Sequence, residues 1–267
     1  MSDYQTIAIE KADGVDWLLL NRPGQLNAID PVMIRELNHY CDGVETDLSV
    51  RVIVIKGAGR AYCAGLDLNS TIVENANVTD ILEGQRSIAR IFMKMRRIPQ
   101  VIVSLVHGPA CGGGFAMALA SDIRLAGESA RMNAAFIRLG LSGCDMGVSY
   151  FLPRMIGVSA AAELLLTGDF IGAERALSLG LVSQVVPDEE LDAVGARTVQ
   201  SLLHASPLGL QLTKECLRMN LDAPSLDAAI AMEDRNQTLC VASGEFREGI
   251  AAFLEKRPPH YPRPAVA

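Results

Sequence analysis

The most informative stretch of the chain reads His107-Gly108-Pro109-Ala110-Cys111-Gly112-Gly113-Gly114-Phe115-Ala116-Met117-Ala118-Leu119-Ala120-Ser121-Asp122. The apolar, β-branched run before it, 101–106, is typical of a buried strand. The apolar run 115–120 after the glycines predicts a short buried helix. Because glycine loses much backbone freedom on folding, three in succession indicate a close backbone approach or unusual dihedral angles.

This arrangement of strand, glycine turn and helix has two interpretations. The glycines can simply allow tight packing against a neighbouring strand. Alternatively, the first N–H groups of the helix, which lack intrahelical partners and carry the positive end of its dipole, can face a negative oxygen. A phosphate loop is disfavoured, because no Gly-Lys-Ser/Thr follows the glycines.

A second loop favours the functional interpretation. Arg60-Ala61-Tyr62-Cys63-Ala64-Gly65-Leu66-Asp67-Leu68 also follows an apolar strand, predicted over 51–56. Two such loops can direct two backbone N–H groups at one carbonyl oxygen, which is the arrangement of an oxyanion hole.

Motifs spread in order over nearly the whole chain resemble the crotonase (enoyl-CoA hydratase/isomerase) superfamily. Besides the two loops, they are Leu20-Asn21-Arg22-Pro23, Asn27-Ala28-Ile29, Ser121-Asp122-Ile123-Arg124, Leu165 with Thr167-Gly168, Gly180-Leu181-Val182 and Phe253-Leu254-Glu255-Lys256-Arg257-Pro258. The resemblance implies an acyl-CoA thioester ligand, with coenzyme A as part of the substrate and no separate cofactor. By position, it implies Leu66 and Gly113 as the two oxyanion donors.

The alternation of predicted strands and helices favours an α/β fold. The resemblance implies a crotonase-like spiral of ββα units over residues 1–200. It also implies a helical C-terminal trimerisation region over 201–267, and therefore a homotrimer or a dimer of trimers. Within the core we expect a hairpin around Asp13-Gly14, a helix capped by Asp30, a surface loop over 70–79 and a helix over 80–97 with Ile81 on its apolar face.

The acid-base groups of the family's hydratases are missing. Two glutamates activate water in those enzymes, and their positions here are Ala116 and Phe136. A carboxylate nearby, Asp145, matches the place of a functional aspartate in related dienoyl-CoA isomerases and dehalogenases. We therefore predict Asp145 as a candidate acid/base; the alternative is that it caps a helix predicted over 146–155.

The resemblance also implies residues around the substrate. It assigns a set of loop residues to the groove that binds coenzyme A, where their backbone would contact the ligand. These residues are Gln25, Asn27, Ala28, Ala64, Gly65, Asp67, Leu68 and Gly112. Phe136 would contribute to an apolar acyl pocket. Lys256, near the C-terminus, would reach a phosphate, in the same subunit or a neighbouring one.

The composition is that of an ordinary globular protein, with 267 residues of which 49% are hydrophobic and 21% charged. The net charge of −7 argues against a nucleic-acid partner, and no basic run suggests a membrane surface. With no membrane span and no signal peptide in the sequence, we expect a soluble, cytoplasmic protein. The six cysteines predict free, buried thiols, and the four scattered histidines predict no metal site.

Three functions fit these observations. The first is an acyl-CoA enzyme of the hydratase/isomerase type, closer to an isomerase than to a standard hydratase because both glutamates are replaced. The second is a catalytically silent acyl-CoA binding protein. The third is an acyl-CoA hydrolase with Asp145 as nucleophile.

Overall fold

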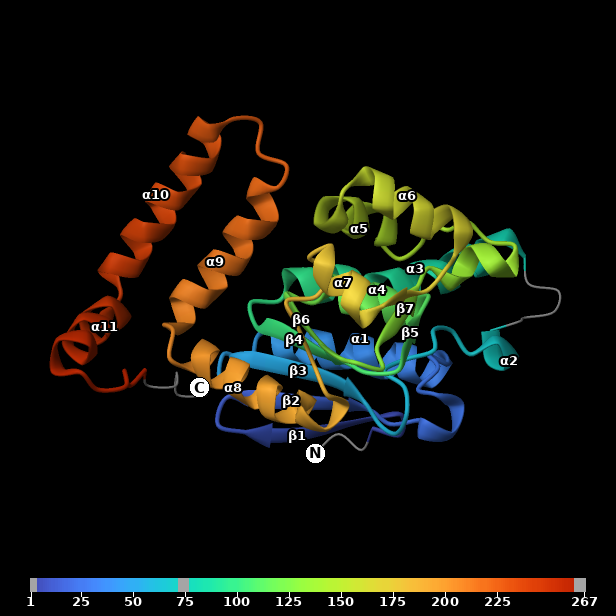
Figure 1. Cartoon of the computed structure of the whole chain (residues 1–267). Helices are drawn as coiled ribbons and strands as arrows, with labels where there is room; N and C mark the ends of the chain where they lie inside the picture. Colours follow the sequence, from blue (N-terminus) through green and yellow to red (C-terminus); the bar gives the residue numbers. More distant parts are fainter. Residues whose placement is uncertain (1–3, 72–76, 262–267) are drawn as a thin grey trace.

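The computed structural model describes residues 4–71 and 77–261, and its core is a six-stranded sheet (Figure 1). The strands lie in the order β1-β2-β3-β4-β6-β9. Their bounds are β1 Ile7–Ala12, β2 Val15–Leu20, β3 Val52–Gly57, β4 Val101–Val106, β6 Ile123–Gly127 and β9 Gln184–Val186. The hairpin β1–β2 is antiparallel, with Asp13 and Gly14 at φ of 46° and 83°, and the other pairs are parallel. The predicted α/β fold is confirmed.

Three short strands form a second sheet in the order β5-β7-β8. They are β5 Pro109–Cys111, β7 Arg131–Asn133 and β8 Ile171–Gly172. β5 lies directly before the helix of the glycine stretch, so this small sheet fixes where the helix starts. The sequence did not predict these strands, because two or three residues are too few to show a period.

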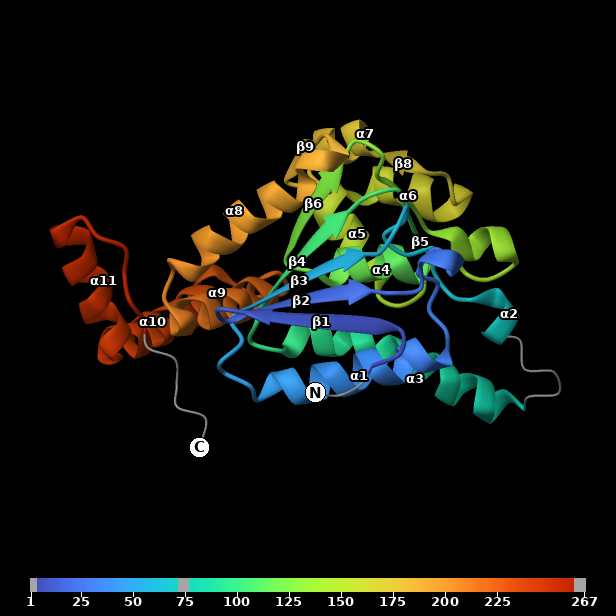
Figure 2. The same cartoon turned by 90° about the horizontal axis from the view of Figure 1, so that it is seen from below.

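Helices cover both faces of the large sheet (Figure 2). On one face, α1 (Pro31–Glu45) and α3 (Val78–Arg97) pack over alternate strand residues such as Ile53 and Ile55. On the opposite face, α8 (Leu191–Leu203) covers Val52 and Val54. This two-sided burial explains why the central strands are uniformly apolar.

Helix α4 (Gly113–Ala120) lies inside the molecule and is buried at every residue, as the sequence predicted. Its neighbours include α3 and α5 (Val148–Ile156). The short α2 (Leu68–Thr71) and the first residues of α3 occupy part of the loop predicted over 70–79, whose residues 72–76 lie outside the described part of the chain. Ile81 is 59% exposed, so its predicted place on the buried face of α3 is wrong. The buried face begins further along α3, at Ile88.

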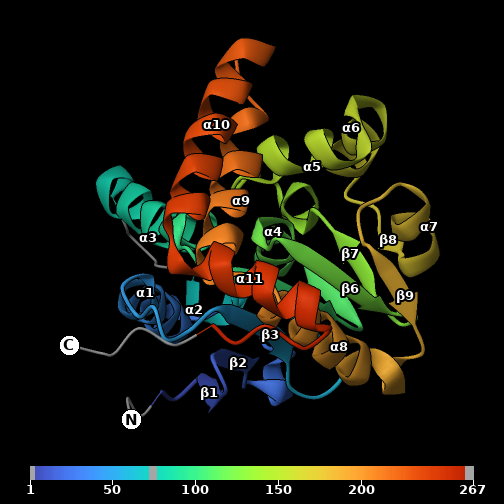
Figure 3. The same cartoon turned by 90° about the vertical axis from the view of Figure 1, so that its left-hand side faces the viewer.

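The second half of the chain is mostly helical. After α6 (Val158–Thr167) and α7 (Ala173–Ser178), the chain returns to the sheet through β9 and α8. The last helices are α9 (Pro207–Asn220), α10 (Leu226–Ala242) and α11 (Gly244–Glu255). They extend from the core as an arm, here called the C-terminal arm (Figures 1 and 3). The predicted boundary at residue 200 falls inside α8, and the division into two regions stays a prediction.

Lys214 fastens this arm to the core. It lies on α9, is 6% exposed, and its Nζ is 2.9 Å from Oδ2 of Asp122. It also donates hydrogen bonds to the carbonyls of Met95 (3.1 Å) and Gln100 (2.7 Å). Asp122 in turn pairs with Arg96 at 3.1 Å and accepts the N–H of Ile102. Asp122 is therefore structural, and it links α9 to the strand β4.

We predict that Lys214→Met lowers the free energy of unfolding by about 3 kcal/mol, because it leaves the partly buried carboxylate of Asp122 with fewer partners. As a control, Lys56→Met removes a more exposed partner of Asp192 and should cost less than about 1 kcal/mol. Urea denaturation of both variants measures the difference. Equal effects of the two substitutions would contradict an anchoring role for Lys214.

Candidate active site

The two glycine-bearing loops lie side by side with their backbones in contact. A β-bridge joins Cys63 to Ala110, and the Cys63 N–H donates to the Pro109 carbonyl at 3.1 Å. A Cβ on Gly114 would lie 2.2 Å from the carbonyl oxygen of Cys63. A Cβ on Gly65, whose φ is +96°, would lie 2.8 Å from the Cys111 carbonyl oxygen. The first interpretation of the glycines, close packing, is therefore correct.

The same packing brings the two predicted donors together. The nitrogen of Gly113 would lie 3.5 Å from a Cβ on Gly65, the residue before Leu66. Within the described part of the chain, the N–H groups of Leu66 and Gly113 donate no hydrogen bond. Gly113 is the first residue of α4, where the helix dipole adds positive potential. This geometry is compatible with the second interpretation, an oxyanion hole.

Apolar side chains surround Gly113. A Cβ at Gly113 would lie 3.1 Å from Cδ1 of Ile29 and 3.4 Å from Sδ of Met146. The ring of Phe136 lies against Gly112, 3.3 Å from where a Cβ would stand. Low polarity around the donors strengthens any hydrogen bond that they make to a charged oxygen.

Asp145 lies beside this apolar region and is partly buried. Its Oδ1 accepts hydrogen bonds from the Met146 N–H, at 2.7 Å, and from the side chain of Gln85 on α3. Burial raises the pKa of Asp145, and the two hydrogen bonds oppose that rise. The alternative function as a helix cap does not hold in the predicted form, because α5 begins at Val148 and is preceded by Gly147 at φ 84°.

Nothing in the sequence indicates that Gln85 contacts Asp145. It lies on the exposed first half of α3, sixty positions before Asp145, and no motif connects the two. Because both donors bind Oδ1, the second oxygen of the Asp145 carboxylate has no partner among the described residues. That oxygen is free to accept or donate a proton.

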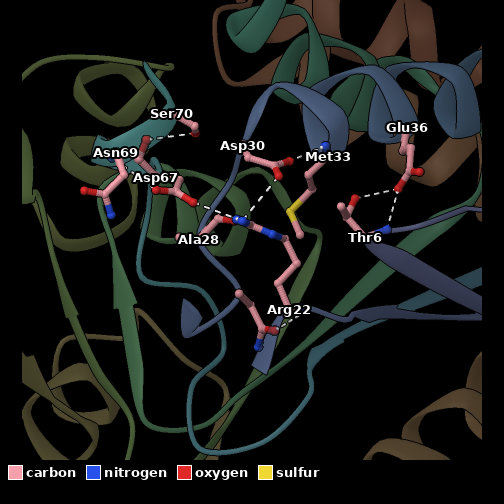
Figure 4. A network of polar contacts seen from close by, with 10 residues as sticks. Thr6, Arg22, Ala28, Asp30, Met33, Glu36, Asp67, Asn69 and Ser70 are labelled. Carbon is pink, nitrogen blue, oxygen red and sulfur yellow. Dashed lines mark hydrogen bonds and ion pairs between the residues drawn. The ribbon is translucent and has the colours of Figure 1, made fainter. Parts of the chain in front are cut away.

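Arg22 connects the two stretches that were assigned to the coenzyme (Figure 4). Its guanidinium pairs with Asp67 at 3.0 Å and with Asp30 at 3.3 Å, and it also donates to the Ala28 carbonyl. Asp30 meanwhile caps α1 by accepting the Met33 N–H, as predicted. Arg22 belongs to a quoted motif, but its function as a clamp depends on contacts that the sequence does not show.

Asn27 was assigned to the coenzyme groove, and this assignment is corrected. The residue is fully buried, and its side chain donates at 2.8 Å to the carbonyls of Ala58 and Ala61. Its Oδ1 accepts the N–H of Arg22. Asn27 therefore shapes the loop and is inaccessible to a ligand.

The remaining predicted positions differ in accessibility. Gln25 and Leu68 are exposed, Ala64 and Asp67 are partly buried, and Ala28, Gly65, Gly112 and Phe136 are buried. Lys256 ends α11 in the arm, away from the two loops in the same chain (Figure 1). The predicted contact of Lys256 with a phosphate, in the same subunit or a neighbouring one, stays a prediction.

Three further observations concern metal ligands, membrane spans and cysteines. Within residues 4–71 and 77–261, no three His, Cys, Asp or Glu side chains are grouped closely enough to hold a metal ion. In the same residues, no helix has the length and apolar character needed to cross a membrane. All six cysteines are free, but Cys144 is exposed, in contrast to the buried thiols that were expected.

Comparisons of the sequence and the fold with known proteins give consistent results. A family model described as enoyl-CoA hydratase/isomerase matches residues 10–264. A probable enoyl-CoA hydratase of Mycobacterium bovis is 40% identical over 249 residues, 91% of this chain and 87% of the relative. A 1,2-epoxyphenylacetyl-CoA isomerase of Escherichia coli is 34% identical over 263 residues, 98% of this chain and 99% of the relative. The crystal structure of an enoyl-CoA hydratase from Bacillus anthracis matches with a TM-score of 0.91 at 30% identity, covering 96% of this chain and 99% of that one.

We predict that Gly114→Ala lowers the free energy of unfolding by about 1–3 kcal/mol or more, because the new methyl group meets backbone that cannot rotate away. Gly84→Ala is the matched control. It adds a methyl group within α3, where nothing lies within 4 Å, and should stabilise by about 0.5–1 kcal/mol. Thermal or urea denaturation of both variants checks the pair. A harmless Gly114→Ala would disprove the close packing.

Proposed function

Since the chain belongs to the enoyl-CoA hydratase/isomerase family, we propose that it moves a double bond within the acyl group of an enoyl- or dienoyl-CoA thioester. Asp145 transfers the proton, and the backbone N–H groups of Leu66 and Gly113 stabilise the enolate. The observation that carries this proposal is the partly buried Asp145, held beside the glycine loops by Gln85 and Met146.

The reaction needs no second reactant. The Asp145 carboxylate removes a proton from an acyl carbon, and the released electron pair moves onto the thioester oxygen. When the enolate collapses, the protonated Asp145 returns the same proton to another carbon of the conjugated system. Two N–H donors at a developing oxyanion are typically worth several kcal/mol of barrier.

The replacement of both family glutamates supports isomerisation over hydration. Ala116 is fully buried in α4, and the Phe136 ring packs on Gly112, so neither position can activate water. A double-bond shift needs one proton-transfer group, which Asp145 supplies. The similarity to a relative named as an acyl-CoA isomerase is in agreement with this preference.

The pKa of Asp145 suits this function. Burial raises it from the ordinary value towards the range in which a carboxyl group exchanges protons efficiently near neutral pH. Its two hydrogen bonds lie on one oxygen and fix the orientation of the other. The second carboxylate oxygen of Asp145 would therefore be held in one orientation toward the substrate carbon.

We predict that Asp145→Asn reduces turnover of an enoyl-CoA or dienoyl-CoA panel by about 10²-fold or more, because the amide keeps the shape but does not exchange the proton. Affinity for saturated acyl-CoA should hardly change, since the proposed donors are backbone groups. Asp192→Asn, at an exposed pair with Lys56, is the matched control. Full activity of Asp145→Asn would remove the proposed acid/base.

The same variant separates the other two functions. A silent binding protein binds thioesters but converts none of them, with or without Asp145. A hydrolase releases free coenzyme A and passes through an acyl group bound to Asp145, which mass spectrometry detects as added mass on that residue. An isomerase changes the substrate without releasing a thiol.

We predict that kcat/KM falls on the acidic side through the pKa of Asp145, because only the carboxylate removes a proton. Since burial raises that pKa, the midpoint should lie above the ordinary aspartate value of 3.8. Gln85→Leu removes a donor to the carboxylate and should shift the midpoint to still higher pH. A pH–rate profile unchanged by Gln85→Leu would show that this hydrogen bond does not act on the catalytic group.

We further propose that the C-terminal arm joins copies of the chain into a trimer or a dimer of trimers. Eight large apolar side chains on α10 and α11 are between 43% and 83% exposed in the single chain: Leu226, Ile230, Leu239, Val241, Phe246, Ile250, Phe253 and Leu254. Such surface is expected to be covered by a partner. We predict that light scattering gives three or six times the mass of one chain. A monomer at micromolar concentration would contradict the proposal.

A further inference from the structure

A cavity of about 700 Å³ lies between the core and the C-terminal arm. Its volume is in the range of small-molecule pockets. Much of the wall is apolar and comes from three helices, with Phe92 on α3, Phe151 on α5, Met219 on α9, and Leu221 directly after α9. None of these positions belongs to the two loops or to the stretch assigned to the coenzyme.

Met146 connects this cavity to the proposed active site. Its side chain lines the cavity, and its sulfur lies 3.4 Å from where a Cβ of Gly113 would stand. Asp145 is the preceding residue. Met146 therefore separates Gly113 from the cavity, and an acyl chain whose carbonyl binds at Gly113 would reach the cavity by passing this side chain.

The cavity carries more positive than negative charge. Four arginines contribute to its wall, against the single acidic residue Asp222: Arg96, Arg97, Arg154 and Arg218. This is a local property, because the whole chain has a net charge of −7. A cavity with this balance favours an anionic group at its far end.

Two of the four arginines already have carboxylate partners. Arg96 pairs with Asp122 at 3.1 Å, and Arg154 pairs with Asp222 at 3.0 Å. Arg97 and Arg218 form no ion pair with any residue that the structure describes. Arg97 is exposed, whereas Arg218 is partly buried on α9. Arg218 is therefore the cation best placed to bind an anion inside the cavity.

We propose that the cavity receives the distal end of the acyl group, and that the substrate carries a second carboxylate there which binds Arg218. The inference rests on the proposed function, because Asp145 sets the direction in which the acyl chain runs. A guanidinium offers several N–H donors in a planar fork that matches a carboxylate. The apolar wall accommodates the methylene groups between the two ends.

Calorimetry with non-reacting ligands tests this inference without any turnover. The probes are saturated straight-chain acyl-CoA thioesters and the monothioesters of dicarboxylic acids of equal length. We expect tighter binding of the dicarboxylic series. Arg218→Met should weaken that series by roughly tenfold to a hundredfold, the range of a charge-assisted hydrogen bond, and leave the monocarboxylic series unchanged.

Two further variants serve as controls for the loss of charge and for the loss of an arginine elsewhere in the chain. Arg218→Lys keeps the charge without the planar fork and should retain part of the preference for the dicarboxylic series. Arg197→Met, on α8 across the sheet from α3, is the matched control and should change neither series. A thermal melt confirms that each variant is folded.

The outcomes distinguish this inference from the isomerase proposal. If the wild-type protein prefers dicarboxylic thioesters and Arg218→Met abolishes the preference, the inference holds even where no substrate is isomerised. Asp145→Asn should lose turnover and keep the preference. The inference is overturned if the two series bind equally at every chain length. It is also overturned if Arg218→Met weakens both series equally, and both outcomes are independent of the isomerase assay.

Discussion

The contact between two loop backbones, the Cys63–Gly65 turn and the Gly112–Gly114 turn, is the constraint on which the rest of the structure depends. No side chain fits between the Cys63 carbonyl and Gly114. The helix that starts there must therefore lie inside the molecule, and all of its residues must be apolar or small. The orientation of the Leu66 and Gly113 N–H groups follows from this packing. The proposed oxyanion hole is thus built from the same contacts that stabilise the core.

The sequence predicted the elements that depend on local patterns. The strands with β-branched runs, the hairpin at Asp13-Gly14 and the helix capped by Asp30 all occur as expected. It did not predict the three-residue strand β5. It also placed Ile81 on a buried face, although the first part of α3 does not pack against the core. Strand β5 is too short to show a period in the sequence. The exposure of Ile81 depends on where α3 meets the core, which the pattern of α3 itself does not show.

The candidate site shows the same division between local and distant information. The glycine loops and Asp145 could be identified from motifs, because the resemblance assigns positions in order along the chain. The donor from Gln85 and the clamp of Arg22 could not be identified, since each joins residues far apart in sequence. Asn27 was assigned wrongly for a related reason: a conspicuous motif residue need not face a ligand, and this one is fully used by backbone carbonyls.

Helix α9 combines a structural and a recognition task through its own periodicity. Lys214 and Arg218 are four residues apart and therefore lie on neighbouring turns of one face. Lys214 is buried at Asp122, whereas Arg218 lies in the cavity wall. A shift of α9 by even one residue would move Lys214 away from Asp122 and Arg218 away from its place in the cavity wall, so the buried ion pair also fixes the register in which the arm presents Arg218. Since the proposed oxyanion donors are backbone groups, side chains on α9 can change the preferred acyl group while the enolate-stabilising step stays the same.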